Sequence, residues 1–155
     1  MRKLLAAIAI FFIFLSCGFK PIYKLTSDDI RIDGYSVKFT NQVSREIIEE
    51  VNSAIVQSED QKYLALLTIY EDLTPLIVNT NGTVAKYRIE IEIKYELLQI
   101  DSDEVISSGT TRGFAQYDVT DSEIVNEDTK KSMTKIATKN AIQLMTSRIQ
   151  SSISR

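Results

Sequence analysis

The sequence predicts an α+β fold, in which two helices cover one face of a four-stranded, mostly antiparallel sheet. One predictor is the nearly perfect alternation of apolar and charged residues from Ala85 to Leu97, typical of a strand with one buried face. A second is a pair of segments with helical spacing on either side of the strand-rich middle of the chain. The order of elements is then β-α-β-β-β-α, a two-layer sandwich.

The first strand is predicted to end near residue 39. Two sets of alternating apolar residues precede that point but are out of phase by one: Ile30 and Ile32, then Tyr35, Val37 and Phe39. Asp33-Gly34 lies at the slip, so we expect one strand with a bulge or bend there. A small hairpin turning at Asp33-Gly34 is the alternative.

A helix is expected from about Gln42 to Gln57, with Thr40 or Asn41 as its N-cap. Its apolar residues recur at helical spacing: Val43, Ile47, Ile48, Val51, Ala54 and Ile55.

The segment from Tyr63 to Tyr70 is the longest strongly apolar strand signal. Ala65, Leu67 and Ile69 share one face, while Leu64, Leu66 and Tyr70 share the other. A strand that is apolar on both faces is buried on both, either within the monomer or by a partner. Pro75 follows and predicts an edge or a kink, because proline donates no hydrogen bond to a neighbouring strand.

Two further strands are predicted after a hairpin turn at Asn81-Gly82. In the strand from Ala85 to Leu97, a register slip of one residue would bury six charges, so this strand fixes the sheet. Those charges are Lys86, Arg88, Glu90, Glu92, Lys94 and Glu96. The fourth strand spans Val105 to about Tyr117, where Gly109 and Gly113 allow bends or a close backbone approach.

The chain closes on a second helix. Thr120 with Glu123 forms a candidate capping box, and Ser122 is an equally good cap. The predicted apolar stripe comprises Met133, Ile136, Ala137, Asn140, Ala141, Leu144 and Ile149. Four lysines on the opposite side indicate a solvated face, and the segment from Ser151 to Arg155 is expected to fray.

The first 16 residues have the layout of a secretory signal. Met1-Arg2-Lys3 is basic, Leu4 through Leu15 is an apolar run of 12 residues, and Ser16 precedes the only cysteine, Cys17. The run is too short to cross a bilayer, and the small-residue–Cys junction is similar to a bacterial lipoprotein signal, in which the cysteine is acylated. A single-pass anchor with an ordinary cysteine is the alternative. In enterobacterial lipoproteins an aspartate after the cysteine signals retention in the inner membrane. The resemblance to such signals therefore implies, with Gly18 at this position, delivery to the outer membrane on its periplasmic side.

Composition narrows the function. Residues 17–27 form a lipidated N-terminal segment too apolar to be a free tether, and residues 28–155 form one domain. Loss of Arg2 and Lys3 from 18 basic residues leaves 16, which against 21 acidic residues gives a mature net charge of −5 and argues against nucleic-acid binding. The chain has no histidine and one cysteine, so we expect no enzyme activity, no cofactor and no metal.

Several motifs of the mature chain resemble the LptE family, the lipopolysaccharide-assembly lipoproteins. They are Cys17-Gly18-Phe19-Lys20-Pro21-Ile22-Tyr23, then Gly82-Thr83-Val84-Ala85-Lys86-Tyr87-Arg88 leading into Tyr95-Glu96-Leu97, and the strand from Ser107 to Tyr117 before a long helix. The resemblance covers nearly the whole mature chain. It implies a non-enzymatic outer-membrane lipoprotein that plugs the LptD β-barrel, assisting the assembly of the barrel and the delivery of lipopolysaccharide to the outer leaflet.

Two sets of residues are candidates for contacts outside the chain. Leu64, Leu66 and Tyr70 either contact the barrel or meet the N-terminal segment or a loop of the same chain. Lys86, Arg88 and Lys94, with Arg112, are candidates for lipopolysaccharide phosphates. Three glutamates on the same strand face make a self-neutralising, solvated ladder the favoured interpretation of those cations.

Two alternative functions stay open. One is a different outer-membrane lipoprotein that acts as a scaffold or binds a small apolar ligand between helices and sheet. The other is a carboxylate enzyme using Asp28/Asp29 or Asp118/Asp121, although acid pairs at turns are usually caps.

Overall fold

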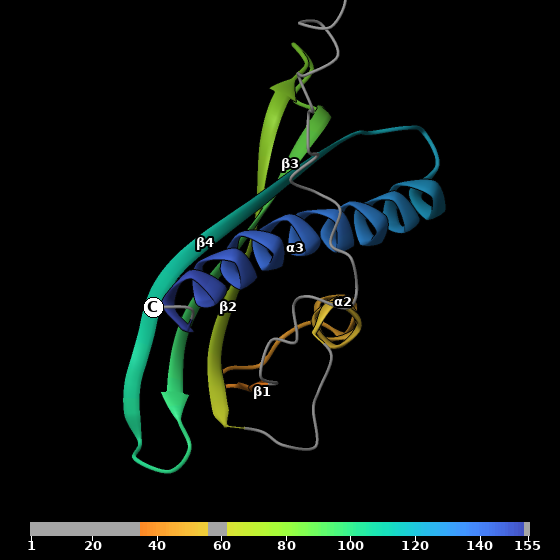
Figure 1. Ribbon diagram of the computed structural model, residues 1–155. Coiled ribbons are helices and arrows are strands. Elements are labelled where there is room, and N and C mark those ends of the chain that lie inside the picture. Colours follow the sequence, from red (N-terminus) through yellow and green to blue (C-terminus); the bar gives the residue numbers. More distant parts are fainter. Residues whose placement is uncertain (1–34, 56–61, 154–155) are drawn as a thin grey trace, which may run out of the picture. The chain divides into compact units, whose positions relative to one another are not determined.

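The computed structural model describes residues 35–55 and 62–153. Within these ranges the order is strand, helix, three strands, helix, which confirms the predicted α+β fold (Figure 1). The elements are β1 (Tyr35–Phe39), α2 (Arg45–Ala54), β2 (Tyr63–Val78), β3 (Val84–Gln99), β4 (Glu104–Asp118) and α3 (Glu123–Ile153).

The sheet has the strand order β1-β2-β3-β4, so neighbours in sequence are neighbours in space. β2 pairs with β3, and β3 with β4, in antiparallel fashion. β1 runs parallel to β2 and pairs with it only from Tyr63 to Leu67. The connection between β1 and β2 contains α2, as a parallel pair requires. The predicted mostly antiparallel sheet is therefore confirmed.

The core lies between one face of the sheet and the two helices, which cover the same face (Figure 1). α3 packs on β3 and β4, and α2 packs on α3. The helices are also joined at their surface by Glu49, which pairs with Arg45 at 2.8 Å and with Lys135 of α3 at 3.2 Å. Fully buried side chains include Ile47, Leu67, Ile89, Ile91, Ile93, Leu97, Ile142, Met145 and Ile149.

The close approach predicted at Gly113 is confirmed. A Cβ built at this position would lie 1.9 Å from the Ala137 carbonyl oxygen and 2.6 Å from the Ala141 nitrogen. The backbone of α3 therefore rests on β4 with no room for a side chain. Gly109 is less tightly enclosed, since its added Cβ would meet the Tyr95 hydroxyl at 3.0 Å.

The first helix is shorter than predicted, beginning at Arg45 rather than at about Gln42. Thr40 and Asn41, the predicted caps, bind β2 instead: Thr40 donates to the Leu67 carbonyl at 3.1 Å, and the Asn41 amide donates to Ile69 at 2.7 Å. Ser44 is the residue before the helix, with an extended backbone and no side-chain cap. Because Thr40 and Asn41 bond to β2, neither side chain caps the helix.

The predicted stripe of the last helix is wrong in part. Ile136 and Leu144 are 44% and 50% exposed, and Asn140 is exposed as well. The buried residues that the prediction missed are Thr134, Thr138, Ile142 and Met145. The face of α3 that meets Gly113 centres on Ala137 and Ala141, so the side chains beside these alanines enter the core. The threonines are tolerated because Thr138 donates to the Thr134 carbonyl at 2.8 Å and Thr134 donates to Glu71 at 3.2 Å.

The ends of α3 also differ from the expectation. Ser122 accepts from the Val125 N–H at 3.5 Å, while Asn126, not Glu123, binds the backbone of Thr120. The helix continues to Ile153 rather than fraying from Ser151, because Ser152 donates to Ser107 of β4 at 3.0 Å.

The predicted signal 1–16, the lipidation site Cys17, the segment 17–27 and the bend at Asp33-Gly34 lie outside the described residues. Among the residues that are described, no helix has the length and apolar character needed to span a membrane.

Candidate partner surface

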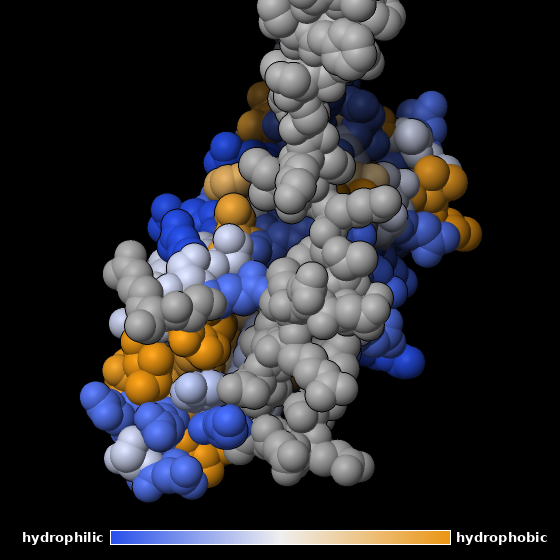
Figure 2. Space-filling view, in the orientation of Figure 1, coloured by the Kyte–Doolittle hydropathy of each residue, from blue (hydrophilic) through white to orange (hydrophobic). Residues whose placement is uncertain are grey.

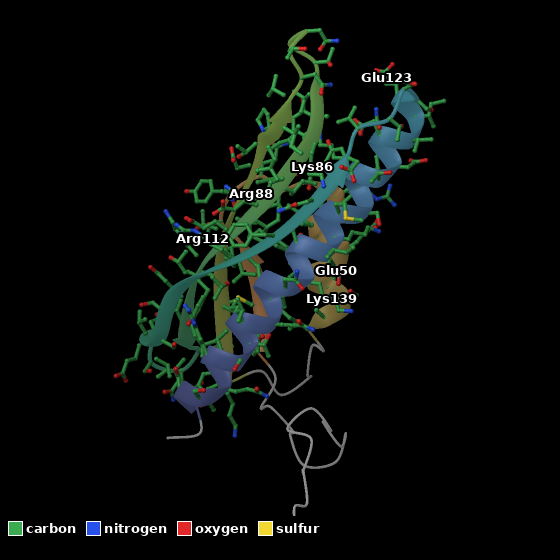
Figure 3. The ribbon with its side chains drawn as sticks, turned by 90° about the horizontal axis from the view of Figure 1, so that it is seen from above. Glu50, Lys86, Arg88, Arg112, Glu123 and Lys139 are labelled. Atoms are coloured by element: carbon green, nitrogen blue, oxygen red, sulfur yellow. The ribbon has the colours of Figure 1, made fainter. Side chains whose placement is uncertain are left out.

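The sheet face turned away from the helices is called the outer face here. It carries the alternate residues of the strands, including all six charges from Lys86 to Glu96 on β3. Figure 3 shows Lys86, Arg88 and Arg112 on the strands, with Glu50 and Lys139 on the helices. The register that places Ile89, Ile91 and Ile93 in the core leaves these charges in contact with water, as the alternation predicts.

Arg112 of β4 is the centre of an ion-pair network on this face. Its guanidinium donates to the Glu92 carboxylate at 2.7 and 2.5 Å and lies 3.3 Å from that of Glu90. The hydrogen bonds from Arg112 hold the pKa of Glu92 below its usual value, and the same bonds raise the pKa of Arg112. One arginine thus joins two neighbouring glutamates across the strand pair.

The three candidate lipopolysaccharide cations each pair with an acid. Lys94 lies 3.6 Å from Glu92, Arg88 lies 3.8 Å from Glu90, and Lys86 lies 3.1 Å from Asp118. These pairs agree with the self-neutralising ladder that the sequence favoured. Binding of lipopolysaccharide by Lys86, Arg88 and Lys94 stays a prediction.

Two aromatic rings flank the ladder. The Lys94 ammonium lies 5.1 Å from the ring centre of Tyr70, and the Arg88 guanidinium lies 5.6 Å from that of Phe114. Such contacts hold a cation over the negative face of a ring while its outer side stays solvated. Sequence reasoning did not identify Phe114, whose position opposite Glu90 follows only from the register of β3 and β4.

The candidate contacts Leu64, Leu66 and Tyr70 all lie on the outer face of β2. Leu64 is opposite Leu98 and Leu66 is opposite Glu96, and both leucines are half-buried. Tyr70 is 50% exposed. The prediction that both faces of this strand are buried is therefore wrong at Tyr70. An apolar end next to a charged centre is therefore the pattern of this face.

A cleft opens on the helix side, between the start of α2, the middle of β2 and the first half of α3. Its lining is charged or hydroxylic, and includes Glu46, Glu71, Glu127 and Lys131. This lining differs from the mostly apolar lining that is typical of sites for small apolar ligands. No group of histidine, cysteine or acidic side chains able to hold a metal occurs within residues 35–55 and 62–153.

β2 is longer than predicted and includes Pro75. Its pairing to β3 shifts register between Pro75 and Ile77 and ends at Val78, so the proline marks an irregularity as expected. Beyond Pro75, the side chains of Leu76, Ile77 and Val78 are exposed. Sequence reasoning missed this exposed apolar segment. The signal that could have indicated it is Pro75, which is typical of an edge strand.

Comparison with known proteins gives structural neighbours only. No protein-family model matches the chain, and no curated protein matches it. A candidate lipoprotein from Caulobacter crescentus has 15% identity and a TM-score of 0.57, over 72% of this chain and 83% of its own. Rare lipoprotein B from Shewanella oneidensis has 14% identity and a TM-score of 0.50, over 79% and 99%.

A third neighbour is lipoprotein B from Nitrosomonas europaea, at 13% identity and a TM-score of 0.53, covering 73% of this chain and 79% of its own. The chain shares its fold with these bacterial lipoproteins. At such identities the likeness concerns the fold and not the activity.

Proposed function

We propose that this chain is a lipid-anchored protein of the outer membrane that partners and plugs an LptD-type β-barrel, assisting barrel assembly and the insertion of lipopolysaccharide. The observation that carries the proposal is the outer face, where Arg112 and its neighbours neutralise one another on a sheet whose opposite face carries the apolar core. The sequence resemblance to the LptE family supplies the identity of the barrel.

The anchor in this proposal is Cys17. The signal layout before it supports acylation, and the three neighbours in fold are named as lipoproteins. Each buried methylene of an acyl chain contributes about 0.8 kcal/mol, so more than one chain holds a protein almost permanently at a membrane. A durable anchor keeps the domain beside a barrel in the same membrane.

The outer face suits the inside of a barrel because a barrel lumen is polar and filled with water. The ladder keeps its charges paired and solvated there, at little desolvation cost. Leu64, Leu66 and Tyr70 supply the apolar contacts with the barrel wall or its loops. The apolar core, between helices and sheet, takes no part in the contact.

Direct contact with lipopolysaccharide would require the cations of the outer face to exchange partners. Lys86, Arg88 and Lys94 each have an acidic partner, so a phosphate must displace Asp118, Glu90 or Glu92 from a cation. The bonds to phosphate and to carboxylate are both charge-assisted, so such an exchange replaces one ion pair with another of similar kind. Delivery by the complex does not require this chain to hold the ligand itself.

Co-purification tests the proposal. A C-terminally tagged full chain, extracted from outer membranes in mild detergent, is expected to bring down a barrel protein larger than itself. Cys17→Ser is the matched variant: it should remain unacylated and uncleaved by the lipoprotein pathway, and should lose the barrel from the eluate. Recovery of the acylated chain alone, or normal processing of the serine variant, would contradict the proposal.

A further inference from the structure

β1 stops pairing with β2 at a defined point. The Thr40 N–H donates to the Leu67 carbonyl at 2.9 Å, and then the side chain of Asn41 takes over. Its amide donates to the Ile69 carbonyl at 2.7 Å and accepts from the Ile69 N–H at 3.1 Å, so it copies the two bonds of a strand residue. β2, however, continues nine residues further, to Val78.

The segment of β2 from Glu71 to Val78 is called the open edge here, because within the described residues only β3 pairs with it. The bonds at Leu67 and Ile69 show that their N–H and C=O groups face away from β3. By the alternation of a strand, those of Glu71 and Leu73 face the same way. Pro75 is next in that series, so the N–H it lacks is one that would face outward.

The open edge is also apolar. Leu73 is 37% exposed and Val78 is 57% exposed, with Leu76 and Ile77 between these values. A long apolar edge strand is a template for pairing with another chain, and monomeric proteins usually block it. Here the blocking side chain, Asn41, acts at Ile69 and not beyond.

On the opposite edge of the sheet, β4, side chains of α3 bond to outward-facing carbonyl groups. On β4, Arg148 of α3 donates to the Thr110 carbonyl at 2.7 Å, and Asn140 donates to the Phe114 carbonyl at 3.4 Å. Two groups that face out of the sheet are therefore used by the helix of the same chain. The difference singles out the β2 edge for a partner.

The charge and backbone of the open edge determine which partner fits. Two copies paired antiparallel about Leu73 would set Glu71 opposite Pro75, which loses one backbone bond on each side of the symmetry axis. The two Asp72 carboxylates, one from each copy, would also lie diagonally across the new strand pair on the same face, where like charges repel. A different chain with Lys or Arg opposite these acids avoids both problems.

We propose that the open edge of β2 adds an extended segment of the barrel partner to the sheet by backbone pairing, with a basic residue of that segment opposite Glu71 or Asp72. This inference rests on the proposed function. The wall strands of a closed barrel already use their backbone groups on both sides, so the added segment is a loop of the barrel that reaches into its lumen.

Proline substitution isolates the backbone from the side chain. Leu73→Pro removes an N–H that faces the open edge and no bond to β3, whereas Leu73→Ala removes the side chain and keeps the N–H. Thr110→Pro is the matched change on β4, because the Thr110 N–H also faces out of the sheet. We expect Leu73→Pro to lower the yield of co-purified barrel at least tenfold, while Leu73→Ala and Thr110→Pro lower it less than threefold.

A photocrosslinking amino acid identifies the occupant in the full chain in cells. Placed at Leu73 or Ile77, it should form an adduct with the barrel, and at Thr110 it should not. An adduct with a second copy, an adduct within the same chain, or equal barrel yields from the two Leu73 variants would overturn the inference. If no barrel co-purifies with the unmodified chain, the proposed function fails first, so the two failures are distinguishable.

Discussion

The two faces of β3 solve opposite problems with the same backbone. Ile89, Ile91 and Ile93 are completely buried against the helices, while Glu90 and Glu92, interleaved with them, belong to the ion-pair network of the outer face. Burial of apolar area stabilises the first set, at roughly 25 cal/mol per Å². The second set contributes little to stability. Its charges keep this face of the sheet hydrated and disfavour non-specific association with apolar surfaces. Stability and partner choice are therefore separated within one strand.

The largest effect is expected on the helix side. Ile91→Asp puts an unpaired carboxylate into the packed core and should cost more than about 4 kcal/mol, enough to unfold the domain. Circular-dichroism melting of the full chain in detergent checks this. Glu92→Gln, one residue along on the outer face, is the control and should melt close to the wild type. Equal melting of Ile91→Asp and the wild type would mean that the faces are assigned the wrong way round.

A smaller loss is expected where α3 touches the sheet. Gly113→Ala forces the backbone of α3 away from β4, since its Cβ would lie 1.9 Å from the Ala137 carbonyl oxygen. We expect destabilisation on the order of 1–3 kcal/mol, as for overpacking. Denaturant unfolding measures it. Gly109→Ala is the control, because the atoms nearest to its Cβ, at 3.0–3.2 Å, belong to the end of the Tyr95 side chain and not to the backbone. A larger loss from Gly109→Ala than from Gly113→Ala would contradict the packing described.

Substitution on the outer face should change the pKa of a carboxyl group and leave the domain folded. Arg112→Ala removes the hydrogen bonds that hold the pKa of Glu92 low, so this pKa should rise toward the ordinary glutamate value of about 4.3. Carbon-detected NMR titration of the side-chain carboxyl measures it. The melting temperature should move less than in either core variant. An unchanged Glu92 pKa would show that the Arg112 pair does not form in solution.

The smallest effect concerns stability at acid pH. A carboxylate with a depressed pKa in the folded state stabilises above its unfolded pKa, and this contribution is lost as the pH falls through the folded pKa. Glu92 on the outer face and Glu49, held low by Arg45 and Lys135, both follow this rule. The wild type should lose stability below about pH 4.3 more steeply than the Arg112→Ala variant. Parallel slopes for the two proteins would contradict this assignment.

The strand alternation was predictable because each position depends mainly on its immediate neighbours. The register of β3, the turn at Asn81-Gly82, where Gly82 has a φ of +83°, and the close approach at Gly113 all follow from local patterns. The stripe of α3 did not follow, since helical spacing allows several faces and the contact with Gly113 selects one. The hydrogen bonds between the Asn41 side chain and the Ile69 backbone were not predictable either, because the two residues are 28 positions apart.

The candidate site was predictable to the same extent. Alternation placed Lys86, Arg88 and Lys94 on one face. The pair of Lys86 with Asp118, the bridge from Arg112 to Glu90 and Glu92, and the contact of Arg88 with Phe114 required the register of β4. The open edge of β2 was not predicted, because the end of β1 sets it rather than any pattern within β2. Apolar residues at the start of α3, Ile124 and Val125, are also exposed, and Figure 2 shows apolar surface at that end of the helix.

Crosslinking from the outer face tests the central claim most directly, that this face meets the inside of a barrel. A photocrosslinking residue at Leu66 or Arg88 in the full, acylated chain should yield an adduct with a barrel larger than the lipoprotein. The same residue at Lys139, on the exposed side of α3, is the comparison and should give a weaker adduct. Barrel adducts from Lys139 with none from Leu66 or Arg88 would contradict the account.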